Sequence, residues 1–217
     1  MKFSDRLADH VKDLWVTASE KPFVTAMATG TLEEDRFRYY MLQDYLYLQD
    51  YTDLLQHMLT YTEVPALKDF LTQTMEVVRE ETFQVHLPNM KKLGISDEEI
   101  EAGERSGVIK EYVQYMRKQL EEEGLLAGLT ALLQCSWVYA YIGESVTKTY
   151  SEEIARSPYK SWFDSYTSRG YCEANQNWID LIDKETAAIS PKKAETLLQI
   201  FETCAGYENR FWDVLYE

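Results

Sequence analysis

The chain has 217 residues, of which 45% are hydrophobic and 13% aromatic, and this composition excludes an intrinsically disordered protein. Nine glycines and five prolines supply few turns, which argues against architectures built from many short strands. The formal net charge of −15 argues against nucleic acid or an anionic membrane surface as the main partner, because both attract basic patches.

Helix signals follow one another through the first half of the chain. Ser4 can cap a first helix, because residues 7–18 place apolar side chains at the helical period of 3.6, and Pro22 breaks this pattern. A capping-box pattern at residues 31–34 opens a long helix that runs to about residue 60. Pro65 suits the first turn of the next helix.

The second half of the chain also consists of helix signals. A second capping box occupies residues 96–99, and a helix over residues 108–122 stops at Gly124. An almost uncharged helix covers residues 125–150. Since no stretch alternates like a strand and no linker rich in glycine, serine or proline divides the chain, we predict one all-α domain over residues 1–217, a helical bundle.

One segment needs a comparison with a membrane-spanning helix. Residues 125–143 carry no charge, and their number is close to the length that crosses a bilayer. Thr130, Gln134 and Ser136 interrupt this segment, and acidic residues flank it where a cytoplasmic flank usually carries Lys or Arg. We therefore expect a central buried helix and no transmembrane segment.

The cysteines and the N-terminus favour a cytoplasmic protein. Cys135, Cys172 and Cys204 show no CxxC spacing, so they indicate neither a disulfide framework nor a zinc site, and reduced thiols fit them best. The first residues carry charges throughout, unlike a signal peptide.

The long helix over residues 31–60 places an acid among tyrosines. Tyr40, Asp44, Tyr47 and Tyr51 follow one another at spacings of four, three and four, so they share one face. An acid in such surroundings is a candidate functional group. The alternative is an ordinary acid at the edge of a wide aromatic face.

Two further helices carry a reactive group on a face that otherwise predicts a core. Cys135 lies one turn from Tyr139 on the uncharged helix, although a buried cysteine is often only a small hydrophobic residue. Glu208 shares a stripe with Phe201 and Trp212 on the last helix. A carboxylate there is costly unless it is paired or acts as a general acid, so the alternative for Glu208 is a buried salt bridge with an arginine.

Metal and phosphate motifs are weak or missing in the sequence. His10, His57 and His86 are the histidines, and the paired Glu-x-x-His motifs of a di-iron bundle do not occur. His10 can be interpreted as a haem ligand or as a solvent-facing residue. No Gly-rich phosphate loop and no GxSxG motif is present.

Short blocks of sequence between about residue 20 and residue 212 form a further pattern. They are residues 21–23, 30–32, 35–37, 39–48, 135–139, 143–144, 159–162 with 166, and 207–212. In content, order and spacing these blocks resemble the TenA (thiaminase II) family. The chain departs from the family pattern at Gln134, where a proline is common, and in the region before Tyr112.

This resemblance implies an all-helical fold of the haem-oxygenase type, a homotetramer, and catalysis without metal or cofactor. It also implies hydrolysis of aminopyrimidines from thiamine breakdown, typically 4-amino-5-aminomethyl-2-methylpyrimidine, and cleavage of thiamine itself. By the same resemblance Cys135 is the nucleophile, Glu208 is the acid and base, and Asp44 is the acid that binds the aminopyrimidine edge. The tyrosines that line the site are then Tyr47, Tyr112, Tyr139 and Tyr166.

Two other functions stay open at this point. One is a non-catalytic pyrimidine-binding or regulatory protein, against which the combination of Cys135 with Glu208 argues, since binding alone needs no nucleophile. The other is a redox enzyme of the haem-oxygenase fold that uses haem, two metals or no cofactor. The few histidines argue against its metal-dependent forms.

Overall fold

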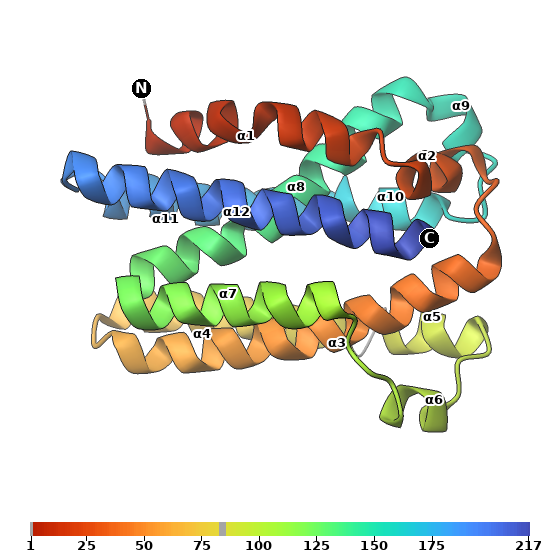
Figure 1. The fold of residues 1–217 in the computed structure, drawn as a ribbon, viewed down its shortest axis with the longest axis horizontal. Helices are drawn as coiled ribbons and strands as arrows, with labels where there is room; N and C mark the ends of the chain where they lie inside the picture. The colour runs from red at the N-terminus through yellow and green to blue at the C-terminus, as the bar shows by residue number, and fades with distance from the viewer. Residues whose placement is uncertain (1, 83–85) are drawn as a thin grey trace. The chain divides into compact units, whose positions relative to one another are not determined.

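The computed structural model describes residues 2–82 and 86–217 (Figure 1). Within these ranges every regular element is a helix, so the prediction of an all-α chain is confirmed. The residues group into two compact units: Met1–Leu32 with Leu129–Glu217 form the first unit, and Glu33–Gly128 form the second.

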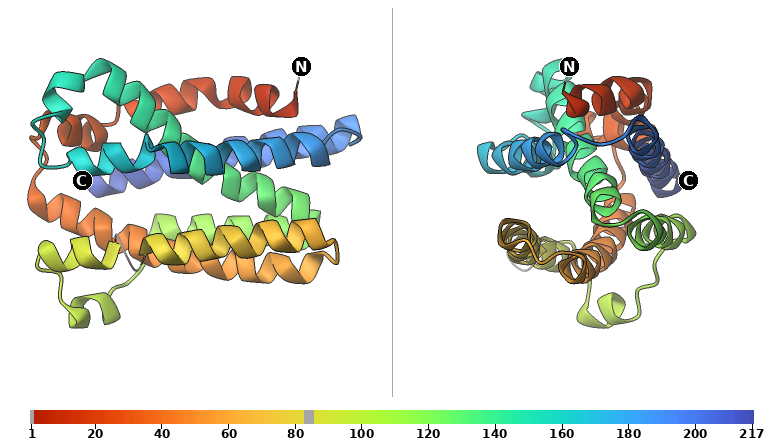
Figure 2. Two further views of the ribbon diagram at one scale, coloured as in Figure 1. Left: turned by 180° about the vertical axis from the view of Figure 1, so that it is seen from behind. Right: turned by 90° about the vertical axis from the view of Figure 1, so that its left-hand side faces the viewer.

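The first unit contains both ends of the chain. The most extensive helix packing in this unit is between α1 and α12, which lie side by side (Figures 1 and 2). Helix α11 also packs on α1. The short helices α2 and α9 pack on each other, and α10 packs on α11. Its helices are α1 (Phe3–Ser19), α2 (Pro22–Thr29), most of α8 (Leu125–Thr149), α9 (Ser151–Ile154), α10 (Lys160–Tyr166), α11 (Arg169–Glu185) and α12 (Pro191–Tyr216).

The second unit is organised around one long helix. That helix, α3, packs against α4, α5 and α7 (Figure 2). Its helices are α3 (Glu34–Met58), the 3-10 turn η1 (Leu59–Tyr61), α4 (Pro65–Glu81), α5 (Leu87–Lys92), α6 (Asp97–Glu101), α7 (Gly107–Glu123) and the first turn of α8.

Most predicted helix boundaries are confirmed. Pro65 opens α4, Gly124 ends α7 at a φ of 87°, and Ser96 forms the expected capping box with Glu99. The capping box expected at residues 31–34 is wrong, because α3 begins after Glu33 and no side chain caps it. The pattern places Thr31 at the N-cap, whereas Glu33, two residues later, occupies that position in the structure.

The uncharged segment forms the single helix α8, as predicted. By length and composition α8 could cross a membrane, and 67% of its most apolar stretch is buried inside the protein. Such burial is typical of the core helix of a folded protein. Gly128 in its first turn permits close packing, since a Cβ there would lie 2.7 Å from Cε of Met58 and 3.1 Å from Cδ1 of Leu120.

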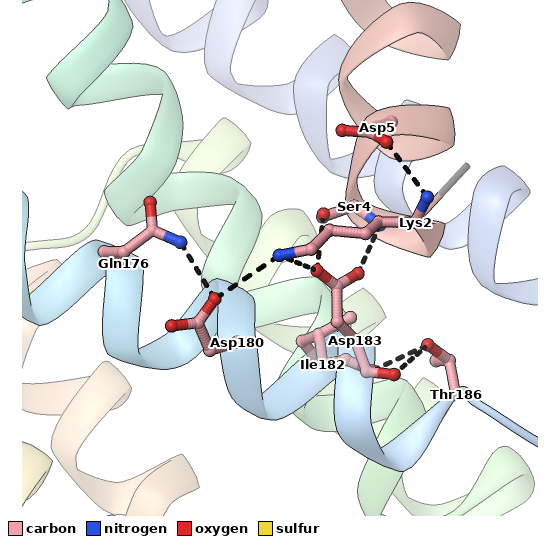
Figure 3. Close-up of polar contacts among 8 residues, drawn as sticks. All are labelled: Lys2, Ser4, Asp5, Gln176, Asp180, Ile182, Asp183 and Thr186. Carbon is pink, nitrogen blue, oxygen red and sulfur yellow. Dashed lines mark hydrogen bonds and ion pairs between the residues drawn. The ribbon is translucent and has the colours of Figure 1, made fainter.

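The N-terminus of α1 is capped by a residue from another helix. The prediction that Ser4 caps α1 is wrong, because α1 begins at Phe3 and Ser4 lies in its first turn. Asp183 of α11 takes this role: its carboxylate accepts hydrogen bonds from the Ser4 backbone N–H and the Ser4 hydroxyl, both at 2.8 Å (Figure 3). The ammonium of Lys2 lies 3.4 Å from the same carboxylate (Figure 3). A negative charge at this position satisfies donors that a helix leaves unpaired.

We expect Asp183→Ala to lower the free energy of unfolding by about 1–2 kcal/mol, the usual cost of losing a helix cap. Asp180→Ala is the matched control, because Asp180 also faces Lys2 but only at 3.8 Å and with both side chains more than half exposed. Its cost should stay below about 0.5 kcal/mol. Chemical denaturation of the two variants measures this difference, and equal losses would contradict the capping role.

Candidate active site

The aromatic and acidic face predicted for α3 is buried. Tyr40, Asp44, Tyr47 and Tyr51 all belong to the buried residues of that helix. The rings of Tyr47 and Tyr51 pack edge to face, with centroids 6.0 Å apart. The Tyr40 hydroxyl lies 3.5 Å from Oδ2 of Asp44, at the long limit of a hydrogen bond. Asp44 is therefore a core acid rather than an acid at the edge of the face.

The main partner of Asp44 is a histidine that no sequence spacing connects with it. Nε2 of His86 lies 2.7 Å from Oδ2 of Asp44, and both side chains are 6% exposed. His86 directly precedes α5, and α5 packs on α3. Forty-two residues separate the two side chains, so only the packing of these helices brings them together.

Two of the predicted tyrosines meet in the second unit. The rings of Tyr47 on α3 and Tyr112 on α7 stack, with centroids 5.8 Å apart and planes inclined by 16°. The buried side chain of Gln43 fixes the segment before α7: its amide accepts from the Ser106 N–H at 2.7 Å and donates to the Glu104 carbonyl at 2.9 Å. Gln43 thus helps to place Tyr112, although the resemblance is weakest in the region before Tyr112.

In the first unit, Cys135 and Tyr139 lie on one face of α8 and are both buried. The ring of Tyr139 packs against Tyr166 of α10 at a centroid distance of 4.9 Å. It also packs against Trp162 at 5.9 Å and against Trp212 of α12 at 5.5 Å. The two predicted tyrosines of this unit therefore belong to one aromatic cluster, which begins one helical turn from the thiol.

Glu208 is buried on α12, the helix that carries Trp212 of the same cluster. It is 3% exposed and lies one turn before Trp212, whose ring contacts Tyr139. Residues four apart share a helix face, so Cys135 lies on the same face of α8 as Tyr139, and Glu208 on the same face of α12 as Trp212. Because the rings of Tyr139 and Trp212 are in contact, these two faces meet. The thiol and the carboxyl group each lie one helical turn from a ring of this pair.

Helix α11 holds the turn of α8 that contains Cys135. The Tyr171 hydroxyl donates to the Ser136 carbonyl at 2.9 Å, and the Ser136 hydroxyl donates to the Asn175 side chain at 2.8 Å. The Tyr171 ring also packs edge to face on Tyr166 at 5.0 Å. Sequence reasoning missed Tyr171 and Asn175, because neither shows a motif and their role appears only through helix packing.

Glycine at position 143 allows the close approach of α10 to α8. A Cβ at this position would lie 3.2 Å from Cβ of Tyr166 and 3.2 Å from Cγ2 of Thr167. A larger residue would push Tyr166 away, because contacts of this length are tighter than ordinary van der Waals packing. The glycine therefore helps to keep Tyr166 against Tyr139.

The other two thiols lie on helices other than that of Cys135. Cys204 is fully buried on α12, whereas Cys172 is half-buried on α11. Partial burial, and to a smaller extent the charge of Glu144, raise the pKa of the Cys172 thiol. Since a thiolate is the reactive form, Cys172 is a poor nucleophile at neutral pH.

His10, which the sequence left open as a haem ligand or a solvent-facing residue, makes a surface contact. Nε2 of His10 lies 3.2 Å from Oε2 of Glu202, and the two side chains are 35% and 42% exposed. In the part of the chain that the structure describes, no group of three or more His, Cys, Asp or Glu side chains is arranged to hold a metal ion.

These side chains suggest two chemical capacities. In the second unit, the buried carboxylate of Asp44 with its imidazole partner shares a face of α3 with Tyr47, which stacks on Tyr112 of α7. This combination suits a flat ring that carries hydrogen-bond donors. In the first unit, a thiol and a carboxyl group flank an aromatic cluster, and these are the groups of nucleophilic and acid–base catalysis.

Comparisons with known proteins identify relatives of this chain. The family model described as TENA/THI-4/PQQC matches residues 8–217. A relative from Halalkalibacterium halodurans, named aminopyrimidine aminohydrolase, is 32% identical over 100% of this chain and 96% of its own. A relative of the same name from Helicobacter pylori is 28% identical over the full length of both chains.

Solved structures show the same fold. A TenA homologue from P. horikoshii OT3 superimposes with a TM-score of 0.84 at 25% identity, over 100% of this chain and 99% of that one. The predicted all-helical, haem-oxygenase-like fold class is thereby confirmed. Because the family model covers nearly the whole sequence, the chain belongs to the TENA/THI-4/PQQC family.

Proposed function

We propose that the protein hydrolyses aminopyrimidines that arise from thiamine breakdown. The typical reaction converts 4-amino-5-aminomethyl-2-methylpyrimidine and water into the 5-hydroxymethyl pyrimidine and ammonia. The observation that carries this proposal is the aromatic contact between Tyr139 and Trp212, which joins the helix face of a buried thiol to that of a buried carboxyl group. The names of the two bacterial relatives support the same reaction class.

The proposed mechanism uses these two groups in sequence. Glu208 donates a proton to a ring nitrogen, which makes the ring electrophilic, while the thiolate of Cys135 adds to a ring carbon. Ammonia then leaves the methylene carbon, water takes its place, and the thiolate is expelled as the aromatic ring re-forms. Burial of both groups excludes bulk water and strengthens their electrostatic interaction with the substrate.

Asp44 and the tyrosines have binding roles in this proposal. The Asp44 carboxylate accepts a hydrogen bond from the amino group on the pyrimidine edge, and tyrosine rings stack on the flat ring. Their burial supports this assignment, because small-molecule sites are enclosed by mostly apolar and aromatic side chains with a few polar groups. The tyrosines assigned here are Tyr47, Tyr112, Tyr139 and Tyr166.

Further properties belong to the same proposal. Thiamine is a second substrate, with the thiazole as its leaving group, and the reactions serve thiamine salvage in the cytoplasm. The protein acts as a homotetramer without a cofactor, and residues 1–217 act as one functional domain. The match of one family model to residues 8–217, which include parts of both compact units, supports the single domain.

The two other functions considered are less well supported. A non-catalytic pyrimidine-binding protein needs Asp44 and the tyrosines but gives no reason for a buried thiol and a buried carboxyl group next to one aromatic cluster. A redox enzyme finds support in the fold alone, whereas the relatives named above are aminohydrolases.

We expect Cys135→Ser to lower kcat/KM for the aminomethyl pyrimidine by about a thousandfold or more, since a hydroxyl is a much weaker nucleophile than a thiolate. Cys172→Ser is the matched control, because this thiol lies on another helix and its pKa is raised. It should keep activity within about twofold of the unsubstituted protein. Ammonia release measures both variants, and nearly full activity of Cys135→Ser would refute the nucleophile.

We expect Glu208→Gln to lower kcat by about a hundredfold to ten thousandfold, the range attributed to one general acid–base group. KM should change little, because the amide keeps the size and polarity of the side chain. Steady-state kinetics separate the two constants. An increase confined to KM would assign Glu208 to binding rather than to proton transfer.

A further inference from the structure

We propose that His86 is a positioning residue: it fixes the orientation of Asp44 and thereby sets the preference of the site for pyrimidines that carry a 4-amino group. This inference rests on the proposed function, because it assumes that Asp44 binds the aminopyrimidine edge. His86 itself acts only through Asp44 and is not assigned a contact with the substrate.

His86 and Asp44 form a short, buried contact. Nε2 of His86 and Oδ2 of Asp44 are 2.7 Å apart, a short distance for a hydrogen bond between nitrogen and oxygen. In the tautomer with a proton on Nε2, the imidazole donates to the Asp44 carboxylate, whose oxygens are acceptors. Both side chains are 94% buried, which keeps water from competing for this bond.

The two oxygens of Asp44 differ in their contacts. His86 and Tyr40 both approach Oδ2, at 2.7 and 3.5 Å. Among the described residues no hydrogen bond reaches Oδ1 of Asp44. The histidine therefore restrains rotation of the carboxylate about its terminal bond, and Oδ1 stays accessible to a donor on a ligand as far as the described residues are concerned.

A carboxylate held in this way favours a ligand with an in-plane N–H donor. A 4-amino group presents N–H donors in the plane of the ring, so one of them can reach a carboxylate oxygen held in a fixed orientation. A pyrimidine without this group leaves the oxygen unsatisfied, and a buried unsatisfied acceptor costs binding energy. A freely rotating carboxylate would discriminate less, because it loses more freedom when the ligand binds.

The buried pair of His86 and Asp44 is a costly way to hold α5 on α3. Two apolar side chains of similar volume would stabilise the packing of α5 on α3 at least as well as a buried polar pair does. Tyr40, Tyr47 and Tyr51 show that α3 can fill this face with rings. An acid and a histidine at this position indicate selection for hydrogen bonding rather than for stability.

The test compares two amides at position 86. His86→Gln places its NH2 donor near the position of Nε2, whereas the side chain of His86→Asn is one methylene shorter and cannot reach Oδ2 of Asp44. Isothermal titration measures the Kd of each variant for the 4-amino-5-hydroxymethyl-2-methylpyrimidine product and for the same compound without the 4-amino group. Asp44→Asn and the double variant H86N/D44N complete the cycle.

We expect His86→Asn to weaken binding of the amino compound about tenfold and to leave the compound without the amino group unchanged. His86→Gln should bind the amino compound within about threefold of the unsubstituted protein. In the double variant, the loss should equal that of Asp44→Asn alone, because His86 acts only through Asp44.

Other results would overturn either the role of His86 or the role of Asp44. If Asp44→Asn weakens binding but folded His86→Gln and His86→Asn bind alike, the inference about His86 is wrong and the proposed function stands. Equal weakening for both compounds, or an additional loss in the double variant, would show a structural role and also overturn the inference. If Asp44→Asn has no effect on the amino compound, the assigned role of Asp44 in the proposed function fails first. Loss of amino-group discrimination in folded His86→Gln decides against the inference even where His86→Asn does not fold.

Discussion

One constraint runs through the whole candidate site: each reactive side chain lies one helical turn from an aromatic ring that is packed against another helix. Cys135 precedes Tyr139 in this way, and Glu208 precedes Trp212, with the two rings in contact at 5.5 Å. A long helix allows this arrangement because residues four apart share a face. Packing of the ring sets which face of the helix points to its neighbour, and the reactive group on that face is positioned with it.

The constraint also explains why the helices of each unit carry polar anchors next to their aromatic residues. In the second unit, Gln43 bonds the segment before α7, and the stacked ring of Tyr112 follows on that helix. In the first unit, Tyr171 bonds the Ser136 carbonyl beside the thiol. A hydrogen bond of fixed direction limits sliding between helices, which apolar packing alone resists less. These anchors therefore supply the accuracy that catalysis requires.

Much of the fold could be predicted from the sequence, because helical periodicity, prolines at first turns and glycine stops are local signals. The helix over residues 125–150 and the stop at Gly124 were predictable in this way. The caps were predicted less well. Asp183 caps α1 from a helix some 180 residues away, and no local pattern contains such a contact.

The same distinction applies to the candidate site. The aromatic and acidic face of α3 follows from spacing alone, and its burial is confirmed. His86, Tyr171 and Asn175 could not be predicted, because their significance comes from partners on other helices rather than from neighbours in sequence. The roles given to Cys135 and Glu208 came from a family resemblance, and they stay predictions about chemistry.

The central claim is that the buried thiol and carboxyl group make this protein a hydrolase rather than a binding protein. The most direct measurement follows 4-amino-5-aminomethyl-2-methylpyrimidine under multiple turnover, with ammonia and the 5-hydroxymethyl product quantified together. The account predicts that both products accumulate in equal amounts, far beyond the amount of protein present. Tight binding of the aminomethyl compound without release of ammonia would contradict it.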